Sequence, residues 1–164
     1  MWAKVYIWET DKKALAAGHA SMTLSNGIHI SWWPSSKAGK KSVVGNESIP
    51  AKPHQTLTDD ISGEDGKLPT EYVLNLTPAQ LQAITKWWRE FKDKHSDWIL
   101  YEINCSTVVY LALKSAYPLL SAEEGGLWTP FRVEQMVQKL GANQSQRNPQ
   151  PRGLLPNHEF YEHL

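Results

Sequence analysis

The chain has one cysteine, no excess of either charge and no long apolar run. Lysine plus arginine and aspartate plus glutamate each number 17 in 164 residues, so the formal net charge is zero. A chain without a basic stripe lacks the attraction that supplies most affinity for nucleic acids and anionic membranes. No apolar run reaches the roughly 20 residues that a membrane-spanning helix needs. The sequence therefore predicts neither a nucleic-acid partner nor a membrane span.

Cys105 is the single cysteine, so no disulfide forms within the chain. The repeated cysteines of zinc sites are absent too. His19, His29 and Cys105 are metal-ligand types, but three ligands without Cys-x-x-Cys or His-x-x-x-His spacing argue against a metal site. The sequence predicts no metal and no other cofactor.

Strand-forming residues open the chain, followed by a hairpin pattern. Residues 1–10 have no long apolar segment and no small-residue cleavage site, so they predict a first strand and not a signal peptide. Ser25-Asn26-Gly27 then separates two alternating runs, and a three-residue loop pairs Met22 with Ile30. The opposite face of this hairpin carries His19, Ser21, Thr23, His29, Ser31 and Trp33.

Residues 35–69 are rich in serine, glycine, lysine, proline and aspartate. They predict a long loop that acts as a lid or a binding loop, or that is disordered. His54 lies in this loop and is expected at the surface. The same is expected of the three histidines near segment ends, which are His95, His158 and His163.

Three later segments predict helices. Thr77 to Gln80 has the pattern of a capping box with proline at the first helical position. Asn104 is a good N-cap for an apolar run that starts at Cys105, which predicts a buried helix with this thiol in its first turn. A third helix is expected from Thr129-Pro130 to Gly141.

A thiol becomes nucleophilic when a helix N-terminus lowers its pKa, and Cys105 has that placement. A histidine on a facing strand, such as His19, can take the thiol proton. His29 or Ser31 on the partner strand can orient this base, and the sequence leaves that choice open. A packing role for each of these residues also remains open, because free cysteines are usually buried and inert.

The motifs Gly18-His19-Ala20-Ser21, His29-Ile30-Ser31 and Asn104-Cys105-Ser106 resemble those of the circularly permuted, NlpC-like branch of papain-like cysteine hydrolases. This branch includes proteins similar to lecithin:retinol acyltransferase. The resemblance implies an α+β fold, in which a central antiparallel sheet packs against helices. It also implies Cys105 as nucleophile, His19 as general base and His29 or Ser31 as orienting group. Residues 1–142 would then form one catalytic domain, and 143–164 a polar linker and tail.

In papain-like relatives an oxyanion helper precedes the nucleophile, and here Tyr101, Glu102 and Asn104 occupy that stretch. Trp33 is expected at the wall of the cleft. The Trp-rich hairpin and long loop are similar to small bacterial effectors that cleave peptidoglycan cross-links or a target protein. That similarity implies a toxin exported by a contact-dependent machine and blocked by an immunity protein.

The resulting hypothesis is a cysteine hydrolase that cleaves an amide bond through a Cys105 thioester. An acyltransferase or a glutamine deamidase would use the same residues. A non-catalytic binding module is the third alternative, in which Trp33 and the 35–69 loop grip a partner and Cys105 is packing.

Overall fold

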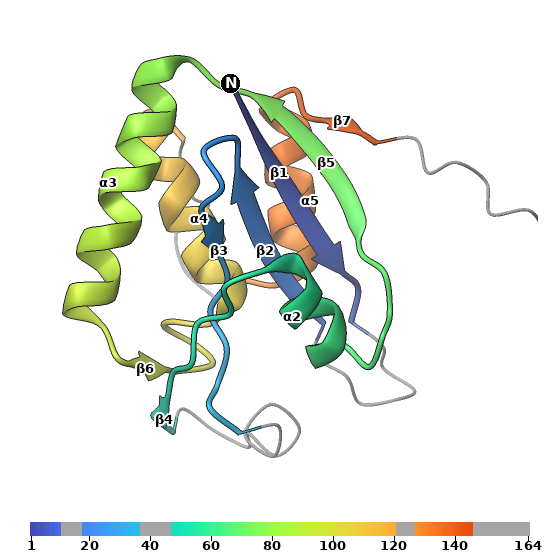
Figure 1. Cartoon of the computed structure of the whole chain (residues 1–164), viewed down its shortest axis with the longest axis vertical. Helices are drawn as coiled ribbons and strands as arrows, with labels where there is room; N and C mark the ends of the chain where they lie inside the picture. The colour runs from blue at the N-terminus through green and yellow to red at the C-terminus, as the bar shows by residue number, and fades with distance from the viewer. Residues whose placement is uncertain (11–17, 37–46, 121–126, 146–164) are drawn as a thin grey trace, which may run out of the picture.

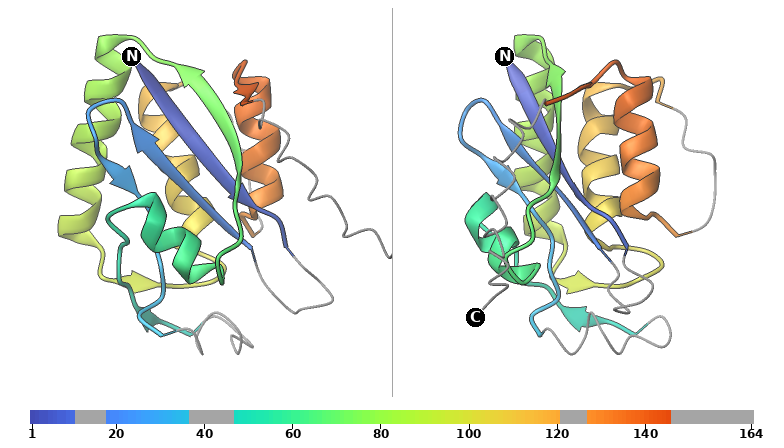
Figure 2. Two further views of the ribbon diagram at one scale, coloured as in Figure 1. Left: turned by 45° about the vertical axis from the view of Figure 1, so that its right-hand side comes forward. Right: turned by 90° about the vertical axis from the view of Figure 1, so that its right-hand side faces the viewer.

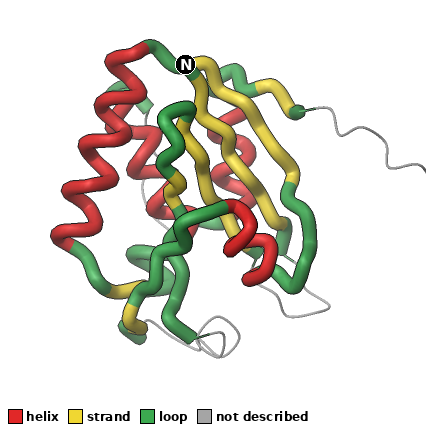
Figure 3. The backbone as a smooth tube through the Cα atoms, viewed as in Figure 1, coloured by secondary structure: helices red, strands yellow, loops and turns green. Residues whose placement is uncertain are grey.

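The computed structural model describes residues 1–10, 18–36, 47–120 and 127–145. The fold is α+β, as predicted, and its centre is a five-stranded antiparallel sheet in the order β3-β2-β1-β5-β7 (Figures 1 and 3). These strands are β1 (Trp2–Trp8), β2 (His19–Leu24), β3 (His29–Ile30), β5 (Thr70–Asn75) and β7 (Asn143–Gln144). A small second sheet pairs β4 (Ile49–Pro50) with β6 (Asp97–Trp98). The helices are α2 (Leu57–Gly63), α3 (Pro78–Lys94), α4 (Cys105–Ala116) and α5 (Pro130–Lys139).

The β2–β3 hairpin has the predicted register. Met22 pairs with Ile30, and the Leu24 N–H donates to the Ile28 carbonyl. Gly27 closes the turn with φ +88°, a left-handed conformation that glycine adopts without strain. This register places the polar side chains of the hairpin on one face of the sheet.

Helices cover both faces of the sheet (Figure 2). Helices α4 and α5 pack on one face against β2 and β1, and α3 packs against α4. The short helix α2 lies on the opposite face, over the polar side of the hairpin. No helix within the described ranges is both long and apolar enough to cross a membrane.

The helix starts follow the sequence signals. Thr77 and Gln80 form a reciprocal capping box at α3, and Thr129 caps α5. The Asn104 side chain accepts the Thr107 N–H and so caps α4, whose first residue is Cys105. Each cap satisfies an N–H group that has no partner within its own helix.

The prediction of a loop over 35–69 is corrected by the structure, although residues 37–46 lie outside the described ranges. Within this segment, residues 49–50 form β4 and residues 57–63 form α2. A capping box between Thr56 and Asp59 starts α2. Residues 143–144, at the start of the expected linker, pair with β5 as β7.

Candidate active site

Cys105 lies where the sequence predicts, at the first position of α4. Its side chain is largely buried, with 8% of the residue exposed. The N-terminus of a helix carries partial positive charge, which favours a thiolate over a thiol. The local structure therefore provides the electrostatic setting of a nucleophilic cysteine.

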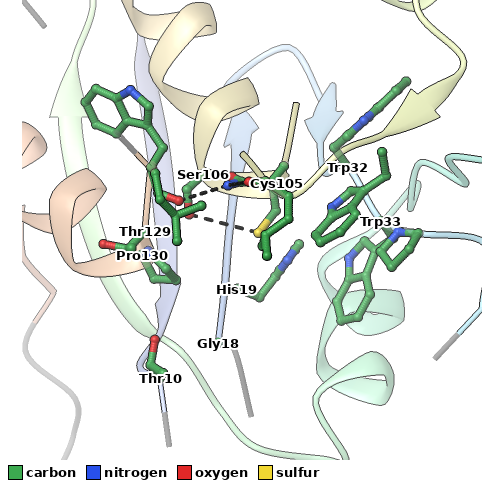
Figure 4. A pocket seen from close by; sticks show the side chains of 15 residues that line it. Thr10, Gly18, His19, Trp32, Trp33, Cys105, Ser106, Thr129 and Pro130 are labelled. Atoms are coloured by element: carbon green, nitrogen blue, oxygen red, sulfur yellow. Dashed lines mark hydrogen bonds between the residues drawn. The ribbon is translucent and has the colours of Figure 1, made fainter. Parts of the chain in front are cut away.

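His19 begins β2 and faces Cys105 across the inner end of a pocket (Figure 4). The imidazole lies close enough to the Cys105 side chain for this thiol to raise the pKa of His19. It is 1% exposed and packs against the rings of Trp8 and Trp33. A thiol and a buried imidazole in contact can exchange a proton without a bridging water.

Ser31 connects the other side of the imidazole to a carboxylate. His19 Nε2 lies 3.1 Å from Ser31 Oγ, and Ser31 Oγ donates to Asp60 Oδ1 at 2.6 Å. Because the Ser31 hydroxyl donates its only hydrogen to Asp60, it accepts a hydrogen bond from His19 Nε2. This assignment leaves His19 Nδ1 for the Cys105 thiol.

Asp60, on α2, is the centre of the buried polar cluster and is 0% exposed. His29 Nε2 contacts Asp60 Oδ2 at 2.8 Å, and His54 Nδ1 contacts Asp60 Oδ1 at 2.9 Å. Trp33 Nε1 donates to Asp60 Oδ1 at 2.8 Å, while His19 Nε2 lies 3.6 Å from the same oxygen. One carboxylate thus orients three imidazoles and an indole. In the described part of the chain, no group of three or more His, Cys, Asp or Glu side chains is arranged to hold a metal ion.

The charges of this cluster reinforce one another. Burial alone would lower the pKa of His19, but the negative charges of Cys105 and Asp60 outweigh burial and raise it above its ordinary value. Burial alone would raise the pKa of the Asp60 carboxyl, but hydrogen bonds with His29 and His54 and the nearby charge of His19 outweigh burial and hold this pKa far below its usual range. The site therefore favours an imidazolium at His19 between two anionic partners.

Two of these residues were missed or misplaced by the sequence analysis. Asp60 was not selected, and His54, expected at the surface, contacts Asp60 and stacks on Trp33 with a 4.6 Å centroid separation. The Thr56 to Asp59 capping box was the available signal, because it predicts a helix inside the presumed loop. Once α2 is recognised, an acidic residue in its first turn becomes a candidate for covering the polar face of the hairpin.

The structure separates the two candidates for orienting His19. Ser31 contacts the His19 ring directly. His29 does not, because its Nε2 forms a hydrogen bond with Asp60 Oδ2 and its Nδ1 forms one with Thr23 Oγ1. Both side chains belong to the same cluster, so neither is on a solvated face. Ser31 is consequently the better candidate for the orienting group.

The residues expected to bind substrate lie in different places. Trp33 and Asn104 line the pocket, whereas Tyr101 is 57% exposed and is not among the lining residues. The Asn104 amide donates to the carbonyl oxygens of Leu100 and Trp128 at 2.7 and 2.9 Å. With both hydrogens engaged, Asn104 ties two walls of the pocket to the start of α4 instead of offering a donor to an oxyanion.

The Ser31 contact leads to a testable difference between two alanine variants. Ser31→Ala removes the hydroxyl between His19 and Asp60, so we expect the rate of iodoacetamide labelling at Cys105 near neutral pH to fall about 3- to 10-fold. His29→Ala leaves the His19–Ser31–Asp60 path intact and should change this rate less than twofold. Circular dichroism checks that both variants fold. A larger loss of reactivity in His29→Ala would return the orienting role to His29.

One protein family matches part of the chain. The family described as the Lnb N-terminal periplasmic domain matches residues 66–139, which is less than half of the chain. The match runs from just before β5 to the end of α5 and contains Cys105, but neither His19 nor Asp60. No curated protein and no solved structure matches the chain. The similarity is therefore to part of a domain named as periplasmic, over the segment that carries the nucleophile candidate.

Proposed function

We propose that this protein is a cysteine hydrolase that cleaves an amide bond through a thioester at Cys105. The observation that carries the proposal is that Cys105, at the start of α4, lines the same pocket as a buried His19 oriented by Ser31 and Asp60. A nucleophile, a base and an orienting group at the wall of a pocket are the parts that covalent acyl chemistry requires. The resemblance of the sequence motifs to those of papain-like cysteine hydrolases supports the same proposal.

The first half of the reaction forms the thioester. His19 takes the Cys105 proton, and the sulfur attacks the carbonyl carbon of the substrate to form a tetrahedral intermediate. The N–H groups of the first turn of α4 stabilise its oxyanion. His19 then protonates the leaving nitrogen, the C–N bond breaks, and an amine departs.

The second half releases the acyl group. A water molecule gives a proton to His19 and attacks the thioester carbonyl. Collapse of the second tetrahedral intermediate breaks the C–S bond, and the sulfur leaves as thiolate or, after protonation by His19, as thiol. The products are a carboxylic acid and the free enzyme. Asp60 and Ser31 act as positioning residues throughout, because they hold Nδ1 of His19 toward the sulfur.

A thiol-labelling experiment tests the nucleophile and base before any substrate is known. We expect the rate of iodoacetamide labelling at Cys105 to remain high below pH 7 in the wild type and to fall at least about tenfold in His19→Ala, because the imidazolium stabilises the thiolate. The rates are measured by intact mass over a pH series. His95→Ala is the matched control, since His95 is exposed at the end of α3.

The outcome that contradicts the proposal is slow labelling that is indifferent to His19. Cys105 would then be a packing residue, and the alternative of a non-catalytic binding module would follow. A reactive thiol would support thioester chemistry in general, and product analysis would then separate hydrolysis from acyl transfer or glutamine deamidation. These three reactions share the thioester and differ in the leaving group or the acceptor.

We further propose that the protein acts as an exported bacterial toxin on a peptidoglycan peptide or a target protein. The periplasmic description of the partly matching family supports a site of action outside the cytoplasm. Delivery by a contact-dependent machine and a cognate immunity protein that blocks the pocket belong to the same proposal. Growth of cells that express the chain with or without a periplasmic signal tests it, because toxicity should require export and Cys105.

A further inference from the structure

The pocket beside Cys105 has an apolar wall. Its cavity measures about 260 Å³. The wall is formed by Trp32, Trp33, Pro34, Trp98, Leu100, Leu127, Trp128 and Pro130. None of the described residues that line it is a lysine, arginine, aspartate or glutamate. Among the described residues of the lining, only His19 and Cys105 carry titratable groups.

The indole N–H groups of Trp32 and Trp33 are engaged away from the cavity, whereas Trp98 Nε1 is buried without a hydrogen-bond partner. Trp32 Nε1 donates to the Asp97 carbonyl at 3.1 Å, and Trp33 Nε1 donates to Asp60. Thr129 Oγ1 accepts the Arg132 N–H at the start of α5. With these groups engaged, the wall presents mainly ring faces and hydrocarbon to a bound molecule.

We propose that the substrate carries a bulky, uncharged, apolar group next to its scissile carbonyl and places this group in the pocket. The inference rests on the proposed function, since it assumes attack by Cys105. Burial of an apolar group against this wall is favourable, whereas a charged group would lose its hydration without gaining a partner. An aromatic or aliphatic side chain of a peptide and a hydrocarbon acyl chain share this chemistry. The described part of the lining offers no cationic side chain to a free carboxylate beside the cleaved bond.

Chloroacetamide reagents test the pocket without a known substrate. The Cys105 thiolate displaces chloride from carbon, so a C–S bond forms as the C–Cl bond breaks. We compare reagents whose amide nitrogen carries a benzyl, an octyl or a carboxymethyl group, and we divide each labelling rate by that measured with free glutathione. At least one of the two apolar reagents should label Cys105 about tenfold faster than the carboxylate reagent, because only the apolar groups gain free energy from burial.

The two apolar reagents distinguish the two kinds of apolar group that the substrate could carry. Faster labelling by the benzyl reagent indicates an amino-acid side chain, and faster labelling by the octyl reagent indicates a hydrocarbon chain. Equal rates for the apolar and carboxylate reagents, or a faster carboxylate reagent, would overturn the proposal. The wild-type comparison alone is decisive and needs no variant to fold.

Substitutions locate the selectivity within the pocket. Leu127→Arg adds a cation to the wall and should reverse the preference in favour of the carboxylate reagent. Leu100→Arg does the same from another wall, in case the first variant is unstable. Leu119→Arg is the matched control because Leu119 is 98% exposed and does not line the pocket. Unchanged selectivity in both folded pocket variants would show that the reagents bind elsewhere and would refute the proposal.

The failure of this inference is distinct from the failure of the proposed function. Slow iodoacetamide labelling that ignores His19→Ala would remove the nucleophile and the base together. Rapid, His19-dependent labelling without preference among the chloroacetamides would keep the hydrolase and remove only the apolar substrate group.

Discussion

Asp60→Ala is expected to destabilise the fold more than any other single substitution in the cluster. The carboxylate has no exposed surface and accepts hydrogen bonds from His29, His54, Trp33 and Ser31. Removing one partner of a buried charged network typically costs about 3–5 kcal/mol, because the remaining groups stay buried without an acceptor. Urea unfolding followed by tryptophan fluorescence measures the free energy of unfolding. Cys105 labelling should slow in parallel, since His19 loses its orientation.

The matched control is Asp93→Ala, which removes an exposed carboxylate from α3 and should leave the free energy of unfolding nearly unchanged. A loss below about 1 kcal/mol in Asp60→Ala would contradict the account of a charged network.

The pH dependence of the free energy of unfolding gives a second check. The pKa of Asp60 is lowered on folding from its ordinary value of 3.8, so its stabilisation is present above pH 3.8 and declines as the pH falls below it. In Asp60→Ala, the free energy of unfolding should therefore fall less steeply than in the wild type as the pH drops below 3.8.

Cys105→Ser should abolish acyl transfer to the protein. With 4-nitrophenyl phenylacetate, an activated ester with an uncharged aromatic acyl group, the wild type should gain the mass of one phenylacetyl group at Cys105 as 4-nitrophenolate leaves. Loss of a nucleophile that works with a general base commonly lowers turnover by about 1,000-fold or more. Stopped-flow absorbance measures the burst, and intact mass locates the adduct.

The control for this variant is chemical. Wild-type protein blocked with methyl methanethiosulfonate should behave like Cys105→Ser and recover after treatment with dithiothreitol. The near-isosteric substitution should change the midpoint of thermal unfolding little. Turnover above about a tenth of the wild-type rate in Cys105→Ser would rule out the thioester and direct attention to another nucleophile.

Local signals predicted the parts of the fold that depend on neighbours in sequence. The hairpin register follows from alternation and a glycine turn, and the start of α4 follows from Asn104 as a capping residue. Cys105 and His19 were selected because a helix start and a facing strand are features that a sequence displays. The α+β class follows from the same elements.

The carboxylate at the centre of the cluster could not be found in this way. Asp60 meets His19 and Ser31 only because α2 folds back over the hairpin, a contact between segments distant in sequence. The polar composition of residues 35–69 is also typical of an exposed loop. Asp60 is nevertheless buried, because its carboxylate forms hydrogen bonds with other buried polar side chains. Burial of polar residues through mutual hydrogen bonds leaves no hydrophobic pattern to detect.

The bridge between Pro34 and Ala51 has a consequence for how this domain can diverge. Backbone hydrogen bonds fix the two ends of the intervening segment, from Ser35 N–H to the Pro50 carbonyl and from Lys52 N–H to the Trp33 carbonyl. The free-energy cost of closing a loop between two fixed ends grows by only about 0.6 kcal/mol for each doubling of the loop length. Insertions and deletions between these anchors therefore leave the path to Asp60 unchanged. Changes of length in this segment can therefore accumulate while the cluster of His19, Ser31 and Asp60 is retained.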